Sequence, residues 1–198
     1  MEIGQYIEEI RRKFSSVYSY LIYGLFCKRF GANIRIYRPL KISGVRYIEL
    51  GCNISIEEGA WITASPLTNS LDSIIKIGNG TRIGHYSHIY GTKEIEIGQN
   101  VLIADRVYIS DNSHAFSNPF IAILDQEILQ LNAVTVGDGA WIGENACLIG
   151  VKVGRNCVIG ANSVVTRDIP DYSVAVGIPA KVIKRYDFIR KAWVGVDD

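Results

Sequence analysis

The residue best placed to do chemistry is a histidine at the start of the longest irregular stretch of the sequence. His114 ends the segment ISDNSH at 109–114 and directly precedes residues 115–133, which follow no repeat. Because histidine titrates near neutral pH, His114 is suited to act as a general base. Asp111 could orient its ring or stabilise its charged form. A surface loop with turn-forming Asp and Asn explains the same segment equally well from spacing alone.

The elements that must position His114 are set by a six-residue repeat. Aliphatic residues recur every six positions and are often followed by glycine, as in Ile77-Gly78, Ile83-Gly84 and Ile89. Three such units make one triangular coil with the aliphatic side chains inside, and coils must stack to bury them. Glycine after the aliphatic suits a corner that needs positive φ or has no room for a side chain. The repeat predicts an all-β fold, a prism of parallel strands.

The interruptions of the repeat fall at one place in each coil. The spacing stays at six within a coil and breaks only after the third unit, so the irregular segments lie on one edge of the prism. Insertions on one side of a repeat protein usually mark its binding side. The largest insertion, a protruding loop at 115–133, is long enough to expect a function.

The two ends of the chain differ from the repeat. Apolar residues from Ile3 to Leu25 recur at intervals of three and four, which predicts a helical segment within residues 1–33. Basic residues flank this segment, so residues 1–30 could lie on an anionic membrane surface. Packing on its own domain or on a partner subunit is the favoured alternative. We expect the repeat domain at 34–170 and a C-terminal tail at 171–198.

Composition excludes several classes of protein. The 198 residues carry a formal net charge of +1 and are 48% hydrophobic, as in an ordinary globular domain. Near-zero charge gives no reason to expect nucleic-acid binding. Acidic residues at positions 2, 8 and 9 argue against a signal peptide, and no cysteine pair has the C-x-x-C spacing. We expect a cytoplasmic protein, with contact at the inner membrane left open.

Four segments together resemble the hexapeptide-repeat acyltransferases, in the branch of the galactoside and maltose acetyltransferases. They lie at residues 110–114, 134–143, 153–170 and 177–185. The resemblance implies a left-handed parallel β-helix, a homotrimer with sites between subunits, and transfer of acetyl from acetyl-CoA to a saccharide hydroxyl. The basic-flanked N-terminal extension looks most like the members that O-acetylate bacterial surface polysaccharide (lipopolysaccharide O-antigen).

The resemblance also implies roles for individual residues. His114 matches the catalytic base, which takes a proton from the sugar hydroxyl. The residues that match positions along the pantetheine arm of acetyl-CoA are Trp141, Gly143, Ala161 and Asn162. Those expected near its adenosine phosphates are Thr166, Arg167, Lys181 and Arg185, whereas Lys184 reads as solvated. Those expected at the acceptor are His88, Tyr90 and Asn112. Tyr90 stands where the galactoside enzymes have an asparagine, so their acceptor specificity does not transfer.

Two other functions compete with acetyl transfer. A trimeric scaffold would keep the prism without chemistry, although His114, Trp141 and the basic tail argue against it. A γ-type carbonic anhydrase shares the fold and holds zinc with three histidines, the number present here. His85 and His88 are three apart in an extended stretch and point to different sides, so we expect no metal.

Overall fold

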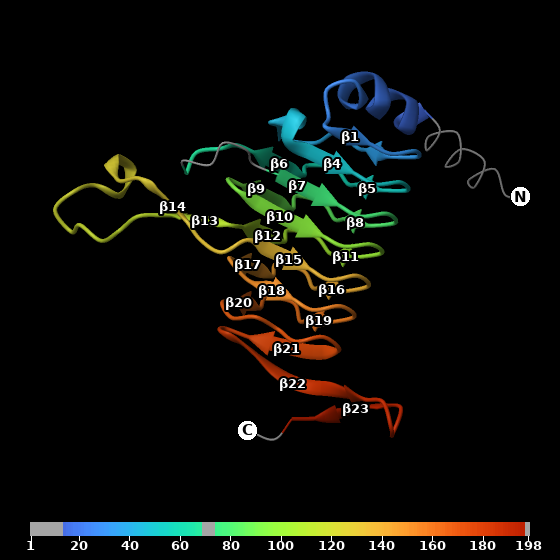
Figure 1. The fold of residues 1–198 in the computed structure, drawn as a ribbon, viewed down its shortest axis with the longest axis vertical. Coiled ribbons are helices and arrows are strands. Elements are labelled where there is room, and N and C mark those ends of the chain that lie inside the picture. Colours follow the sequence, from blue (N-terminus) through green and yellow to red (C-terminus); the bar gives the residue numbers. More distant parts are fainter. Residues whose placement is uncertain (1–13, 69–73, 197–198) are drawn as a thin grey trace, which may run out of the picture.

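Three sheets of short strands make up most of the molecule (Figure 1). The computed structural model describes residues 14–68 and 74–196. Sheet A contains, in spatial order, β1 (Arg29–Phe30), β4 (Ile48–Leu50), β7 (Ile74–Ile77), β10 (Glu94–Ile97), β15 (Val134–Val136) and β18 (Lys152–Val153). Sheet B contains β2 (Arg35–Ile36), β5 (Ser55–Ile56), β8 (Arg82–Ile83), β11 (Leu102–Ile103), β16 (Trp141–Ile142), β19 (Val158–Ile159), β21 (Ser173–Gly177), β22 (Ala180–Asp187) and β23 (Ala192–Gly195). Sheet C contains β3 (Lys41–Ser43), β6 (Trp61–Ala64), β9 (His88–Gly91), β12 (Tyr108–Ser110), β17 (Cys147–Ile149) and β20 (Val164–Val165).

The chain visits the three sheets in rotation. Strands β4, β5 and β6 lie in sheets A, B and C, and β7, β8 and β9 repeat the order one coil further along. Neighbouring strands of successive coils are parallel, as in the pairing of β7 with β10 and of β10 with β15. The prediction of a mostly β fold built from stacked parallel strands is therefore confirmed. The left-handed sense of the coil stays a prediction.

The repeated aliphatic residues form columns inside the stack. In sheet A the column runs through Leu50, Ile77, Ile97, Val136 and Val153, which pair in register from coil to coil. Each of these side chains is almost completely buried. Because burial of one such side chain contributes about 1.5–3 kcal/mol, the columns supply most of the driving force for stacking.

The glycines that follow the aliphatic residues are required by the closeness of the next coil. A Cβ built on Gly78 would lie 2.5 Å from the backbone carbonyl carbon and oxygen of Gly98. A Cβ on Gly84 would meet the carbonyl of Ala104 at the same distance. Neither glycine has positive φ, and the left-handed positions are occupied by other residues, six of them asparagines such as Asn100. These glycines recur every six residues because the next coil leaves no room for a Cβ, and not because the backbone there needs the conformational freedom of glycine.

Alanine at Gly78 is expected to destabilise the protein by about 1–3 kcal/mol, the usual cost of overpacking. The coils are held together by backbone hydrogen bonds, so the stack cannot widen at one point without losing them. Gly195→Ala is the matched control, because a Cβ there meets nothing within 4 Å. Thermal unfolding of both variants measures the difference, and equal melting temperatures would contradict this account of the period.

The N-terminal helix is joined to the stack through Ser19. Residues 14–19 are α-helical and continue into the π-helical turn η1 (Tyr20–Gly24). The Ser19 hydroxyl is fully buried, donates to the carbonyl of Ser15 and accepts from the backbone N–H of Ile36 at 2.9 Å. The predicted helix is thus present in part; its first part, within residues 1–13, lies outside the described residues. Its end comes earlier than the spacing suggested, because residues 29 and 30 form β1.

The C-terminal segment, expected as a tail at 171–198, extends sheet B. Strand β21 pairs in parallel with β19 and antiparallel with β22, and β22 pairs with β23. Ala175 is completely buried and belongs to the main core, against which Ala180 and Val182 also pack. The expected boundary at residue 170 therefore crosses a continuous core.

All the irregular steps of the repeat, whether longer or shorter than six residues, lie where the chain passes from sheet C to sheet A. They occur between β6 and β7, β9 and β10, β12 and β15, and β17 and β18. This confirms the prediction that they share one edge, called here the insertion edge. The longest interruption protrudes as a hairpin, drawn in yellow in Figure 1. Strands β13 (Asn112–His114) and β14 (Ile128–Gln130) form its base, and the short helix η3 (Ile123–Asp125) lies beyond them.

Candidate active site

His114 lies at the end of β13, where the hairpin leaves the insertion edge. It pairs with Ile128 of β14, and its side chain is exposed. The expected loop therefore begins with an ordered strand that fixes the backbone of His114. An exposed imidazole on a fixed backbone can exchange protons with a bound molecule.

Asp111 is held by groups other than His114. Its fully buried carboxylate accepts from the backbone N–H groups of Thr92, Lys93 and Glu94 at 2.7–2.8 Å. It also accepts from the Thr92 hydroxyl and from the Asn112 amide. In the described residues no hydrogen bond joins it to His114. Because these donors occupy both oxygens, Asp111 secures the connection between β9 and β10, which differs from the ring-orienting role expected from the sequence.

Gln130 completes this network and was not singled out by the sequence. Its amide donates to the carbonyl of Asp111 at 2.7 Å, and its amide oxygen accepts from the Thr92 hydroxyl at 3.0 Å. Gln130 pairs with Asn112 across the hairpin, so it joins the base of the hairpin to the neighbouring coil. A lone polar residue shortly before the repeat resumes at Val134 was the only signal in the sequence.

The three residues expected at the acceptor lie together next to this hairpin. The Asn112 amide donates to the backbone carbonyl of Tyr90 at 3.2 Å. Tyr90 lies on β9 opposite Ser110 of β12, which leads into β13. On the same strand, the His88 ring stacks on Trp61 with centroids 4.5 Å apart. The structure thus brings His88, Tyr90 and Asn112 to the sheet C side of the insertion edge.

Burial lowers the pKa of His88. Its Nε2 atom is buried and has no hydrogen-bond partner among the described residues, so a charge on this ring would be poorly solvated. Tyr90 nearby has a raised pKa, mainly because of burial, with further contributions from Tyr108 and Asp111. Both groups are therefore neutral at physiological pH and present apolar rings with polar edges.

This lowered pKa predicts how stability depends on pH. The unfolded chain binds a proton on His88 below about pH 6.5, whereas the folded protein binds it only at lower pH. Stability contributed by neutral His88 is therefore present above pH 6.5 and declines as the pH falls toward the folded pKa. NMR titration of the ring and unfolding curves at several pH values measure the effect, with His88→Phe as the comparison that lacks it. A ring that titrates at or above 6.5 in the folded protein would contradict the prediction.

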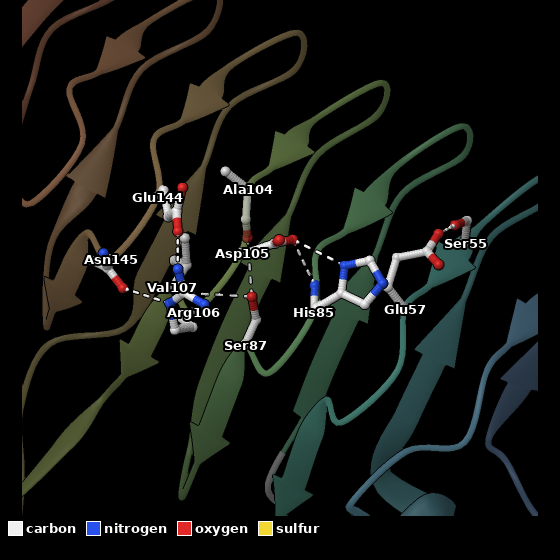
Figure 2. Close-up of polar contacts among 10 residues, drawn as sticks. All are labelled: Ser55, Glu57, His85, Ser87, Ala104, Asp105, Arg106, Val107, Glu144 and Asn145. Carbon is white, nitrogen blue, oxygen red and sulfur yellow. Dashed lines mark hydrogen bonds and ion pairs between the residues drawn. The ribbon is translucent and has the colours of Figure 1, made fainter.

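The three histidines do not converge. Figure 2 shows the His85 ring pointing at Asp105 of the next coil, with Nδ1 3.2 Å from the carboxylate oxygen. His88 stacks on Trp61, and His114 lies on the hairpin. Within residues 14–68 and 74–196, no group of three His, Cys, Asp or Glu side chains could hold a metal ion. The zinc hypothesis therefore has no site in the described part of the chain.

Trp141 lies on a different side of the stack from His114. It is half-exposed on β16 of sheet B. Gly143 follows that strand and is buried, and a Cβ there would lie 2.6 Å from the backbone nitrogen of Ala161. Coil stacking alone thus explains the glycine. Ala161 and Asn162 are exposed at the corner that follows β19.

The remaining residues predicted for acetyl-CoA divide between the two sides. Thr166 and Arg167 are exposed at the turn that leaves β20, on the insertion edge that also carries His114. Lys181 is exposed on β22. One chain therefore does not bring all of the predicted residues into one site.

The strand register distinguishes the basic residues of β22. Paired residues in a sheet share a face. Trp141, Val158, Val174 and Lys184 follow one another in register, so Lys184 shares the face of Trp141. Arg185 instead pairs with Ser173, which is fully buried and lies on the opposite face. The register thus places Lys184, which the sequence suggested was solvated, and not Arg185 on the face of sheet B that carries Trp141.

Comparison with known proteins identifies the family. Residues 133–167 match a family model described as the hexapeptide repeat of succinyl-transferase. The putative lipopolysaccharide biosynthesis O-acetyl transferase WbbJ of Escherichia coli K12 is 33% identical over 85% of this chain and 88% of its own length. The chain belongs to the hexapeptide-repeat acyltransferases. It is therefore an enzyme, an acyltransferase.

Two further comparisons agree with membership of the hexapeptide-repeat acyltransferases. The galactoside O-acetyltransferase of Escherichia coli K12 is 34% identical over 66% of this chain and 63% of its own length. A point mutant of the N-acyltransferase AntD from Bacillus cereus, solved in complex with dTDP and coenzyme A, has a TM-score of 0.69 and 20% identity. That likeness covers 86% of this chain and 90% of AntD and shows a shared fold.

Proposed function

We propose that the protein transfers acetyl from acetyl-CoA to a hydroxyl of a saccharide, in the synthesis of bacterial surface polysaccharide or lipopolysaccharide. The observation that carries this proposal is the position of His114. It ends a strand that is bonded through Asn112 to Tyr90, beside the polar-edged rings of sheet C. The relative WbbJ, which the chain matches over most of its length, is named for lipopolysaccharide O-acetylation.

In the proposed reaction His114 acts as the general base. Its imidazole removes the proton from the acceptor hydroxyl as the oxygen attacks the thioester carbonyl carbon directly. Backbone N–H groups of the coils stabilise the negative oxygen of the tetrahedral intermediate. When the C–S bond breaks, the proton passes from the imidazolium to the coenzyme A sulfur, so His114 returns to its neutral form.

The acetyl-CoA residues fit the donor when two chains share a site. Trp141 offers a half-exposed ring, and Lys181 and Lys184 supply positive charge on the same side of sheet B. His114 lies on the insertion edge instead, so we propose that it faces Trp141 of a neighbouring subunit in a homotrimer with left-handed β-helical chains.

The hairpin offers a surface for such a trimer. It carries exposed apolar residues, Phe116, Phe120, Ile121, Ile123 and Leu124. Burial against a second chain would remove this apolar area from water. Sedimentation measures the oligomeric state, and a fully active monomer would contradict the shared site.

The helix at residues 14–24 supports a contact with an anionic membrane. Its exposed residues Phe14, Val17, Tyr18, Leu21 and Leu25 form a stripe at helical spacing. Ser19 and Tyr23 face the stack, so this apolar stripe is left outside the core. Arg29 is exposed just beyond it. An apolar stripe with a basic flank suits the boundary between headgroups and acyl chains.

Vesicle binding tests this membrane contact. We expect the protein to sediment with vesicles that contain phosphatidylglycerol and less with neutral phosphatidylcholine vesicles. Leu21→Glu with Leu25→Glu should abolish binding, whereas Ile189→Glu, at a residue 94% exposed near the other end of the chain, should not. Equal binding by both variants would contradict the proposal.

No helix among the described residues combines the length and apolarity needed to cross a bilayer. The four cysteines are free, and burial raises the pKa of Cys27 to about 11, which keeps its thiol protonated. Free thiols are usual in a reducing compartment, which supports the proposed cytoplasmic side of the membrane.

An acceptor screen with radiolabelled acetyl-CoA tests the proposed reaction. Free sugars, nucleotide-linked sugars and lipid-linked saccharides are compared, and incorporation of label into at least one saccharide is expected. A protein that transfers acetyl to none of them while remaining folded would favour the alternative of a non-catalytic scaffold.

A further inference from the structure

A groove opens on sheet C close to the N-terminal helix. Its volume is about 700 Å³. Its walls come from β3, the short helix η2 (Val45–Tyr47) and β6. The side chains that determine its chemistry are Lys41, Arg46, Tyr47, Trp61, Thr63 and Tyr90.

The groove carries positive charge without a compensating carboxylate. Lys41 and Arg46 are both exposed, and none of the described lining residues is acidic. The Lys41 ammonium lies 5.3 Å from the centre of the Trp61 ring, and the Arg46 guanidinium lies 4.7 Å from that of Tyr47. Neither cation has an ion pair within the described ranges. In a chain of 21 basic and 20 acidic residues, this is a local excess that favours an anion.

The groove also has an unused hydroxyl hydrogen. The Trp61 indole N–H donates to the Thr63 hydroxyl oxygen at 2.7 Å, and this hydroxyl lies 2.9 Å from that of Ser43. One of the two hydroxyl hydrogens forms the bond between Ser43 and Thr63. The second hydroxyl hydrogen has no acceptor in the described structure. Aromatic rings beside one free hydroxyl donor suit a sugar, which has apolar C–H faces and hydroxyl oxygens.

The groove leads toward His114. Tyr90 lines it and accepts, through its backbone carbonyl, from Asn112 on the strand that ends at His114. Strand β6 lies next to β9, and β9 lies next to β12. Two strand spacings, about 10 Å, therefore separate the middle of the groove from the strand that leads into the hairpin.

We infer that this groove binds an anionic saccharide, with its phosphate or carboxylate at Lys41 and Arg46 and its sugar ring beside Tyr47 and Tyr90. This inference rests on the proposed function, because it assigns the class of acceptor. The bound sugar then extends along sheet C toward His114, so its reactive hydroxyl is distant from its charged group.

Direct binding tests the inference without requiring acetyl transfer. Calorimetry compares glucose 1-phosphate and galactose 1-phosphate with glucuronate and galacturonate, and all four with neutral glucose and galactose. We expect at least one anionic sugar to bind more tightly than its neutral counterpart. Its affinity should fall as the salt concentration is raised. A preference within the anionic set decides between phosphate and carboxylate.

Variants locate the binding. The double variant Lys41→Gln with Arg46→Gln should lower the affinity for the anionic sugar by about tenfold or more, as expected when charge-assisted hydrogen bonds are lost. The matched control removes two cations elsewhere, Arg82→Gln on sheet B and Lys152→Gln on sheet A. Equal weakening in both double variants, equal binding of neutral and anionic sugars, or no binding of any anionic sugar would overturn the inference.

The outcome separates this inference from the proposed reaction. Acetyl transfer to a neutral saccharide with no dependence on Lys41 or Arg46 would contradict the anionic-saccharide site and still support the proposed acetyl transfer. Binding of an anionic sugar that depends on both cations, without transfer to any acceptor, would support the anionic-saccharide site and contradict the proposed acetyl transfer.

Discussion

Replacing His114 by alanine is expected to lower kcat for acetyl transfer by about 10²- to 10⁴-fold, the contribution of a positioned general base. The imidazole is exposed at the end of β13, so its removal leaves no buried cavity and breaks no described hydrogen bond of the side chain. The melting temperature should therefore change little while activity is lost. Initial rates with labelled acetyl-CoA and the acceptor found by screening measure the effect.

His85→Ala is the matched control for this experiment. It removes another exposed imidazole, which lies at the corner between β8 and β9 and pairs with Asp105 (Figure 2). Its activity should remain near that of the unaltered protein. If His114→Ala keeps full activity, or if both variants lose it equally, His114 is not the base.

Replacing Asp111 by alanine is expected to destabilise the protein by about 3 kcal/mol or more. The substitution leaves the backbone N–H groups of Thr92, Lys93 and Glu94 without their acceptor in a buried place, and each buried unpaired donor costs about 1–3 kcal/mol. Asparagine cannot restore the wild type, because its amide nitrogen would face donors. Urea or thermal unfolding measures the loss, which should appear in both variants.

The comparison for Asp111 is another aspartate that accepts from a backbone N–H. Asp168 is exposed and accepts from Lys152 at 2.8 Å, so Asp168→Ala should cost only about 0.5–1.5 kcal/mol. An Asp111→Ala variant as stable as Asp168→Ala would show that the hydrogen bonds of Asp111 do not stabilise the base of the hairpin. Loss of activity in Asp111→Ala at temperatures where it stays folded would show that this network positions His114.

His114 and Asp111 show which features of the site could be predicted from the sequence and which could not. The position of His114 before the long interruption, together with the family motif, indicated it as the candidate base. Asp111 stands only three residues earlier, so sequence proximity suggested a partnership. The three backbone N–H groups that its carboxylate binds lie 17–19 residues away, in the connection between β9 and β10. In a stack of coils the residues that touch are separated by a whole turn, so neighbours in sequence are poor guides to contacts.

The helix at residues 14–24 shows the same limit. Its apolar spacing predicted a helix correctly over the described part, and the same pattern suggested that the apolar stripe faces the core. The buried hydroxyl of Ser19 and its bond to Ile36 turn the helix the other way. Periodicity gives the existence of a stripe, but only the packing of the rest of the chain decides which side is left in water.

By itself the sequence determined the repeating architecture, because a six-residue period of aliphatic residues and close-fitting glycines such as Gly78 admits few other folds. It also located the interruptions on one edge and the histidine among them. The side chains that meet are known only from the folded structure. The register of β22 places Lys184, not Arg185, on the face of Trp141, and the junction of β3, η2 and β6 creates a cationic groove from residues with no shared motif. Such contacts depend on how strands from different coils align, and a one-dimensional pattern does not record that alignment.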